Sequence, residues 1–115
     1  MAVYECDWSR HRYPQAQQSI YYTLALGSVA TTYACRLCPK HFRESQILIR
    51  ENMASIDDES QASVTCDLCE NPREQVIYAK VYAAKEEAQY FAADFCGPHG
   101  SALGQDLHMF NGRAL

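Results

Sequence analysis

The side chains best suited to chemistry in this chain are its six cysteines and four histidines. Two short clusters share one pattern, a cysteine followed three residues later by a histidine: Cys38 with His41, and Cys96 with His99. Thiolate sulfur and imidazole nitrogen are the ligands that zinc prefers in structural sites, so this spacing predicts metal coordination. Cys38 is as far from Cys96 as His41 is from His99, and this common offset indicates that one arrangement occurs twice.

Three disulfide bonds are the other common use of six cysteines in a small protein. Four of the cysteines, however, form pairs separated by two residues, Cys35 with Cys38 and Cys66 with Cys69, a spacing typical of metal ligands. The first residues also lack the basic start and apolar core of a secretory signal. We therefore expect an intracellular, cytoplasmic protein, in which disulfides are rare, and we favour metal binding.

The second half offers the clearer site. Cys66 and Cys69 can point at one ion across a tight turn, and Cys96 and His99 supply a second pair from the start of an expected helix. At a helix start, free backbone amides and the helix dipole favour a thiolate over a thiol. Four protein ligands close the tetrahedron, so we expect this zinc to be structural and not catalytic.

The first half offers two candidate ligand sets. When the candidate ligands of the second half are shifted back by the separation between Cys38 and Cys96, the last three fall on His11, Cys38 and His41. The first, Cys66, falls on Trp8, two residues after Cys6. We favour a set of Cys6, His11, Cys38 and His41, in which Cys35 is a buried thiol. The alternative set takes Cys35 as a ligand in place of His11, because Cys35 forms its own closely spaced pair with Cys38.

Strands are expected upstream of both Cys-His clusters. The residues 19–26 and 29–35 flank Gly27, which suits the first position of a two-residue type II′ hairpin turn because that position needs a positive φ. In the second half, alternating polar and apolar residues predict strands over 75–83 and 87–95. Each half is thus predicted to place a hairpin directly before its cluster.

A helix is expected after each hairpin. Pro39 and Pro98 fall in a first helical turn, where proline is tolerated because its missing amide hydrogen would have no partner. Asn111 followed by glycine is a plausible stop for the second helix. A helix over 85–93 competes with the last predicted strand, because that segment is rich in helix-forming residues; we favour the strand because aromatic residues lead directly into Cys96.

The order of a Cys-x2-Cys pair, a hairpin and a Cys-x2-His pair that opens a helix resembles the treble-clef zinc finger over about residues 64–110. The resemblance implies an α+β fold in which Cys66, Cys69, Cys96 and His99 bind zinc. We expect two such units in tandem, over 1–54 and 64–115, joined by an acidic linker over 55–63, with two zinc ions per chain.

Charge divides the two halves. Residues 1–54 carry six basic and four acidic side chains, while residues 55–115 carry four basic and ten acidic ones, for a net charge of −4 overall. An acidic protein is poorly suited to coat nucleic acid, although the basic half leaves a local contact open. The candidate nucleic-acid ligands there are Arg10, Arg12, Arg36, Lys40 and Arg43.

The sequence contains no phosphate-binding glycine loop, nucleophile elbow or zinc-deaminase signature, so we do not expect an enzyme. No apolar run is long enough for a membrane span. The leading hypothesis is a small zinc-binding adaptor or regulatory protein that binds a protein partner, and one form of it is an inhibitor encoded by a virus or mobile element. The alternative is a zinc-finger protein that binds nucleic acid through its basic first half.

Overall fold

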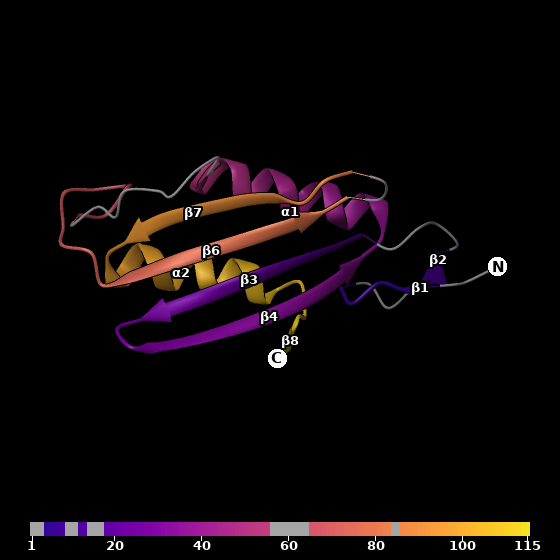
Figure 1. Ribbon diagram of the computed structural model, residues 1–115, viewed down its shortest axis with the longest axis horizontal. Coiled ribbons are helices and arrows are strands. Elements are labelled where there is room, and N and C mark those ends of the chain that lie inside the picture. Colours follow the sequence, from indigo (N-terminus) through magenta and orange to yellow (C-terminus); the bar gives the residue numbers. More distant parts are fainter. Residues whose placement is uncertain (1–3, 9–11, 14–17, 56–64, 84–85) are drawn as a thin grey trace.

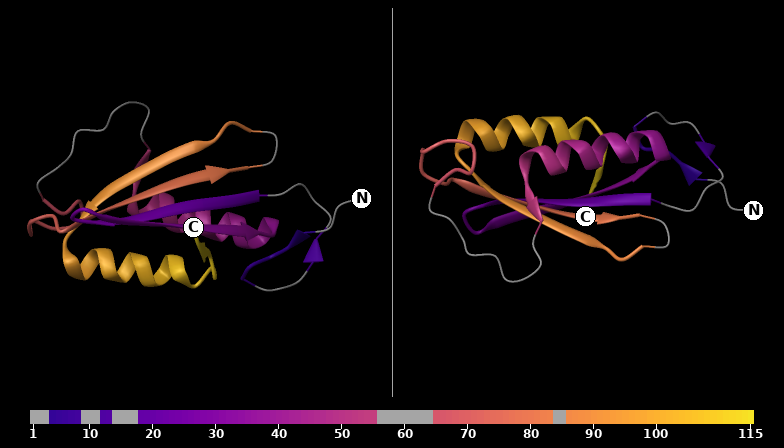
Figure 2. Two further views of the ribbon diagram at one scale, coloured as in Figure 1. Left: turned by 60° about the horizontal axis from the view of Figure 1, so that its bottom comes forward. Right: turned by 90° about the horizontal axis from the view of Figure 1, so that it is seen from above.

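The computed structural model describes the chain except for residues 1–3, 9–11, 14–17, 56–64 and 84–85. Its centre is a six-stranded antiparallel sheet in the order β5-β7-β6-β3-β4-β8, and a two-stranded pair, β1 with β2, lies near the amino terminus (Figure 1). Both helices lie on the same face of the large sheet (Figure 2). The elements are β1 Tyr4–Glu5, β2 Arg12–Tyr13, β3 Gln18–Leu26, β4 Val29–Leu37, α1 Pro39–Asn52, β5 Ala54–Ser55, β6 Gln75–Tyr82, β7 Gln89–Phe95, α2 Gly97–His108 and β8 Arg113–Ala114. The protein is therefore of mixed α+β class, as expected.

Two long hairpins form the middle of the sheet. In the first, Leu26 pairs with Val29 across a two-residue turn in which Gly27 has a φ of 61°, the conformation that the sequence predicts. The second hairpin, β6 with β7, begins its ladder at Gln75 opposite Phe95. The segment from Gln89 onward is a strand, so the helical alternative for this region is wrong there.

Each hairpin leads through a cysteine into a helix. Cys38 and Cys96 are extended N-cap residues, with a proline in the first turn of each helix, as expected from the positions of Pro39 and Pro98. Helix α2 ends at His108, and Asn111, three residues later, adopts a left-handed φ of 58°, close to where the sequence predicts a stop. The two cysteines are thereby held at the same structural position, between an outer hairpin strand and a helix start.

The two halves of the chain share one sheet. Strand β3 of the first hairpin pairs with β6 of the second along a continuous ladder, from Ser19 with Tyr82 to Leu26 with Gln75. In addition, β5, which follows α1, pairs with β7, and β8, which follows α2, pairs with β4. Each half therefore adds a short strand to the outer edge of the sheet, and β5 and β8 do so on the hairpin of the other half. The division at 1–54 and 64–115 stays a prediction, and apart from Ser55 the linker lies outside the described residues.

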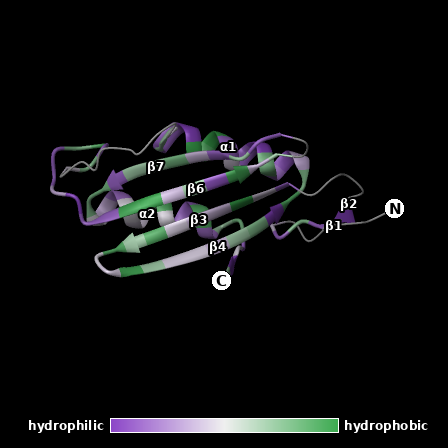
Figure 3. Ribbon diagram, viewed as in Figure 1, coloured by the Kyte–Doolittle hydropathy of each residue, from purple (hydrophilic) through white to green (hydrophobic). Residues whose placement is uncertain are grey.

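The hydrophobic core lies between the sheet and the two helices. Ile20 and Tyr22 of β3, Ile77 of β6 and Leu107 of α2 are completely buried there, because alternate residues of each strand face the helices. Figure 3 shows hydrophobic stretches on the central strands interrupted by hydrophilic residues. The opposite face of the sheet is not covered by either helix (Figure 2).

Candidate metal centres

The second cluster brings together the four ligands expected from the sequence. The Nδ1 atom of His99 lies 3.4 Å from Cys66 Sγ and 3.2 Å from Cys96 Sγ, and Cys69 Sγ lies 3.7 Å from Cys96 Sγ. All four ligand atoms lie within 4.8 Å of one another. Zinc–sulfur bonds of about 2.3 Å imply sulfur atoms about 3.8 Å apart in a tetrahedron. The donor atoms and their spacing therefore fit one zinc ion.

Backbone hydrogen bonds position Cys66 and the turn that contains it. The amide of Cys66 donates to the carbonyl oxygen of Asn71 at 2.9 Å, and the amide of Leu68 donates to Cys66 Sγ at 3.4 Å. The turn is also tied to β7, since Asp67 N donates to the Asp94 carbonyl at 2.8 Å and Asp94 N donates to the Asp67 carboxylate at 2.9 Å. This reciprocal pair fixes the turn next to Cys96.

The thiols of this cluster influence one another's ionisation. Burial raises the pKa of Cys66, but the backbone amides of Cys96 and Leu68, helped by His99 and Cys69, lower it to about 6. The pKa of Cys96 is lowered by the His99 amide, yet burial and the neighbouring thiols raise it overall. One thiolate thus forms easily and disfavours a second beside it. A divalent cation removes this repulsion, as metal binding to a thiolate site requires.

The first cluster contains three described ligands. His41 Nδ1 lies 3.4 Å from Cys6 Sγ and 3.2 Å from Cys38 Sγ, and these three groups lie within 4.8 Å of one another. The imidazole of His41 also stacks on Trp8, with ring centroids 4.7 Å apart. His11 lies outside the described residues, so its role as the fourth ligand stays a prediction. Cys35 is buried but does not belong to the group of three.

The environment of Cys35 is that of a protonated core thiol. Its side chain is completely buried. Burial, together with the nearby Asp7 and Cys6, raises the pKa of Cys35 to about 12. Free cysteine buried in this way behaves as a small hydrophobic residue. The described geometry therefore favours the ligand set without Cys35.

The hydrogen bonds show how the two clusters correspond. Asp7 N donates to the Arg36 carbonyl and Arg36 N donates to the Asp7 carboxylate, both at 2.8 Å, which repeats the reciprocal pair of Asp67 and Asp94. Cys6 therefore corresponds to Cys66, although these two are slightly further apart in sequence than Cys38 is from Cys96. A uniform shift missed this match, whereas the recurring Cys-Asp dipeptide gave a sequence signal for it.

The strand pairing beside each turn follows the same correspondence. Glu5 pairs with Arg12 in the first half, and Thr65 forms a bridge with Pro72 in the second, at the same offset that relates Cys6 to Cys66. By this offset the position that matches Cys69 is Ser9, which lies outside the described residues. The matching position therefore supplies neither a thiol nor an imidazole, and His11 stays the predicted fourth ligand of the first cluster.

Four of the five candidate nucleic-acid residues are described, and all four are exposed: Arg12, Arg36, Lys40 and Arg43. They belong to β2, the end of β4 and the first turns of α1, the elements that meet at the first cluster. Arg10 lies outside the described residues.

Neither described helix has the length and apolar character needed to cross a bilayer.

Comparison with known proteins gives no match to a family model, to a curated protein or to a solved structure. The functional interpretation therefore depends on the residues themselves. They show two Cys/His clusters suited to zinc, held at opposite ends of one sheet (Figure 1).

Proposed function

We propose that this chain is a non-catalytic, zinc-stabilised binding module that recognises a partner protein through the uncovered face of its sheet. Zinc at the two clusters fixes where each helix begins relative to its hairpin, and the treble-clef arrangement of turn, hairpin and helix is part of the proposal. The second cluster supplies four protein ligands, which leaves no open position for a reactive water. Structural zinc contributes about 10–16 kcal/mol in small zinc-finger peptides, enough to stabilise a small fold.

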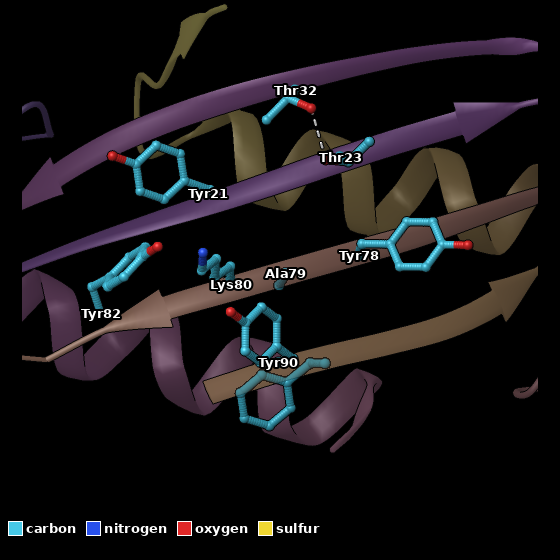
Figure 4. A pocket seen from close by; sticks show the side chains of 9 residues that line it. Tyr21, Thr23, Thr32, Tyr78, Ala79, Lys80, Tyr82 and Tyr90 are labelled. Atoms are coloured by element: carbon cyan, nitrogen blue, oxygen red, sulfur yellow. Dashed lines mark hydrogen bonds between the residues drawn. The ribbon is translucent and has the colours of Figure 1, made fainter. Parts of the chain in front are cut away.

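The observation that carries the proposal is the composition of the uncovered face. Tyr21, Tyr78, Tyr82 and Tyr90 gather there around one lysine, Lys80, in an open groove (Figure 4). Protein interfaces are enriched in tyrosine and depleted of charged residues at their centre. A nucleic-acid surface instead needs several basic side chains to neutralise phosphates. The face therefore fits a protein partner better.

A photo-crosslinking experiment tests this function. We expect p-benzoylphenylalanine in place of Tyr78, which is 44% exposed, to form a discrete protein adduct in the cells that make the chain. The control carries the same group in place of Ile47, which is 51% exposed on α1, the helix side of the sheet. Equal adducts at both positions, or none at position 78, would overturn the proposal. Protease and nuclease digestion identify the adduct as protein or nucleic acid.

Nucleic-acid binding is the second candidate, supported by the four exposed basic side chains around the first cluster. Phosphate contacts by these residues would make binding steeply dependent on salt. Fluorescence anisotropy with labelled duplex and single-stranded DNA at low and moderate salt measures this directly. Binding that weakens with salt and is lost on joint substitution of Lys40→Gln and Arg43→Gln would support this candidate. No binding at the lower salt concentration would exclude it.

A further inference from the structure

The uncovered sheet face contains a groove with a volume of about 340 Å³, which we call the tyrosine groove. It spans the four central strands, and its tyrosine side chains lie around Lys80 (Figure 4). The lining residues are Tyr21, Thr23, Thr32, Tyr78, Ala79, Lys80, Tyr82, Tyr90 and Phe91. None of these nine residues is acidic. Lys80 is therefore the one charged side chain of the lining.

The ammonium group of Lys80 is held by aromatic rings. Its Nζ lies 4.8 Å from the centroid of Tyr82 and 5.2 Å from that of Tyr90, within the range of cation–π attraction. Hydrogen bonding to Tyr82 and Tyr90 raises the pKa of Lys80, so the group stays positively charged at neutral pH. No carboxylate in the described part of the chain forms an ion pair with it. The positive charge is thus positioned, and none of the described carboxylates neutralises it.

The walls of the tyrosine groove are fixed by contacts within the sheet. Tyr21 packs edge-on against Tyr82, with ring centroids 5.5 Å apart, and the hydroxyls of Thr23 and Thr32 are hydrogen-bonded at 2.8 Å. Tyrosine has few rotatable bonds, so its immobilisation on binding costs little conformational entropy. Because the groove is already formed, fewer side chains have to be ordered when a ligand binds, and less of the binding free energy is lost to conformational entropy.

The charge of the tyrosine groove excludes two occupants. A second copy of the chain packed face to face would bring another Lys80 and no carboxylate from the same lining, which is unfavourable. A single-stranded nucleic acid would stack on the tyrosines, but it needs a basic track along its backbone, and the lining offers one cation. An occupant with one local negative charge and adjoining apolar surface fits best.

We propose that the tyrosine groove binds an acidic segment of the partner protein, with an aspartate or glutamate carboxylate on Lys80 Nζ and a neighbouring apolar or aromatic side chain against Tyr78 and Tyr90. These two tyrosines are 44% and 47% exposed, so their rings are available for contact. The inference depends on the proposed function, because it names the chemistry of the partner at the same face. A carboxylate that displaces water from Lys80 makes a charge-assisted bond and sets the register of the segment.

The test uses a phage-displayed library of short random peptides selected on the zinc-loaded full chain. We expect the selected peptides to share an aspartate or glutamate beside an apolar or aromatic residue. Lys80→Gln should weaken the best peptide about tenfold, whereas Arg50→Gln, which removes an exposed cation from α1, should leave its Kd unchanged. Lys80→Arg should retain most of the affinity. Zinc content and thermal unfolding of each variant serve as controls for folding.

Two outcomes would overturn the inference: selected peptides without a shared acidic residue, or equal affinity for the wild type and the Lys80→Gln variant. In either case a protein adduct at position 78 would still support the proposed function, so the two failures are distinguishable. Lys80-dependent binding of a fluorescein-labelled oligothymidylate in place of peptides would assign the groove to nucleic acid and overturn both.

Discussion

The two ends of the sheet repeat one plan with different completeness. At both ends an aspartate that follows a cysteine exchanges two hydrogen bonds with the last part of an outer hairpin strand, and a helix begins immediately afterwards. An arginine lies beside each pair, with Arg113 4.0 Å from Asp7 and Arg73 3.3 Å from Asp94. The second end has four described ligands, however, and the first has three. The backbone of the two candidate sites is thus repeated more faithfully than their described ligands.

An aromatic side chain packs on the histidine of the first cluster, whereas the corresponding residue of the second half is aliphatic. Trp8 stacks on His41 and packs edge-on against Phe110, with ring centroids 4.5 Å apart in the second contact. The matching residue in the second half is Leu68, which is 49% exposed. Packing therefore supports His41 from outside the coordination sphere, and the first end should depend less on its metal than the second.

The largest effect is expected from Cys96→Ala. Loss of a ligand from the complete second cluster should remove one zinc ion and most of its stabilisation, which is comparable with the whole stability of a small domain. Native mass spectrometry should show one zinc per chain, and circular dichroism should show a lower Tm or an unfolded protein. An unchanged Tm with two bound zinc ions would contradict the assignment.

A smaller effect is expected from Cys38→Ala at the matching position. Zinc should again fall to one ion per chain, but Tm should fall less than in Cys96→Ala, because the contacts of Trp8 with His41 and Phe110 remain. The double substitution of Cys38→Ala with Trp8→Ala tests the reason. If its Tm matches that of Cys38→Ala alone, the aromatic contacts do not compensate.

The buried Asp7 should contribute more stability than the exposed Asp67, because Asp7 also lies 4.0 Å from Arg113. Asp7→Ala and Asp67→Ala each leave a backbone amide without its carboxylate acceptor, which should cost about 1–3 kcal/mol. Chemical denaturation of both variants measures the loss. Asp7→Asn and Asp67→Asn keep an acceptor oxygen and should lose less. Equal losses in the two variants would show that burial and the nearby Arg113 add nothing to the hydrogen bond of Asp7.

The smallest effect is expected from Cys35→Ala, which should leave two zinc ions bound. Because burial raises the pKa of Cys35 to about 12, the folded protein holds this proton more tightly than the unfolded chain does. The stability from this group is present below the ordinary thiol pKa of about 9 and is lost as pH rises toward 12. Stability should therefore fall less steeply in the variant as the pH is raised above about 9. One bound zinc ion in Cys35→Ala would instead restore Cys35 as a ligand.

Local signals in the sequence predicted the elements that carry the clusters. Gly27 marked the hairpin turn, Pro39 and Pro98 marked the helix starts, and Asn111 marked a helix stop, because each residue acts through its own backbone preferences. The ligands of the second cluster were also predicted, since short spacings between cysteine and histidine are read directly. These features involve neighbours within a few residues.

Long-range pairing was not predictable in the same way. The pairing of β3 with β6, and of β5 and β8 with the opposite hairpins, depends on the packing of residues far apart in sequence. The segment from Cys6 to Cys38 is longer than the segment from Cys66 to Cys96. A single shift of the sequence therefore cannot align both the cysteine turns and the helix starts. Hydrogen-bond partners identified the match of Cys6 with Cys66, and the recurring Cys-Asp dipeptide is the sequence signal that agrees with it.

The exchange of β5 and β8 between the hairpins has a practical consequence for dissection of the molecule. Each half expressed alone would leave unpaired the strand edges that the other half normally covers. We therefore expect a separate half to pair with another copy of itself. Conversely, a single cut in the polypeptide between the halves should leave both fragments held together. The chain is thus a natural candidate for reconstitution from two separately expressed pieces, and such a split pair would report on sheet assembly independently of either metal.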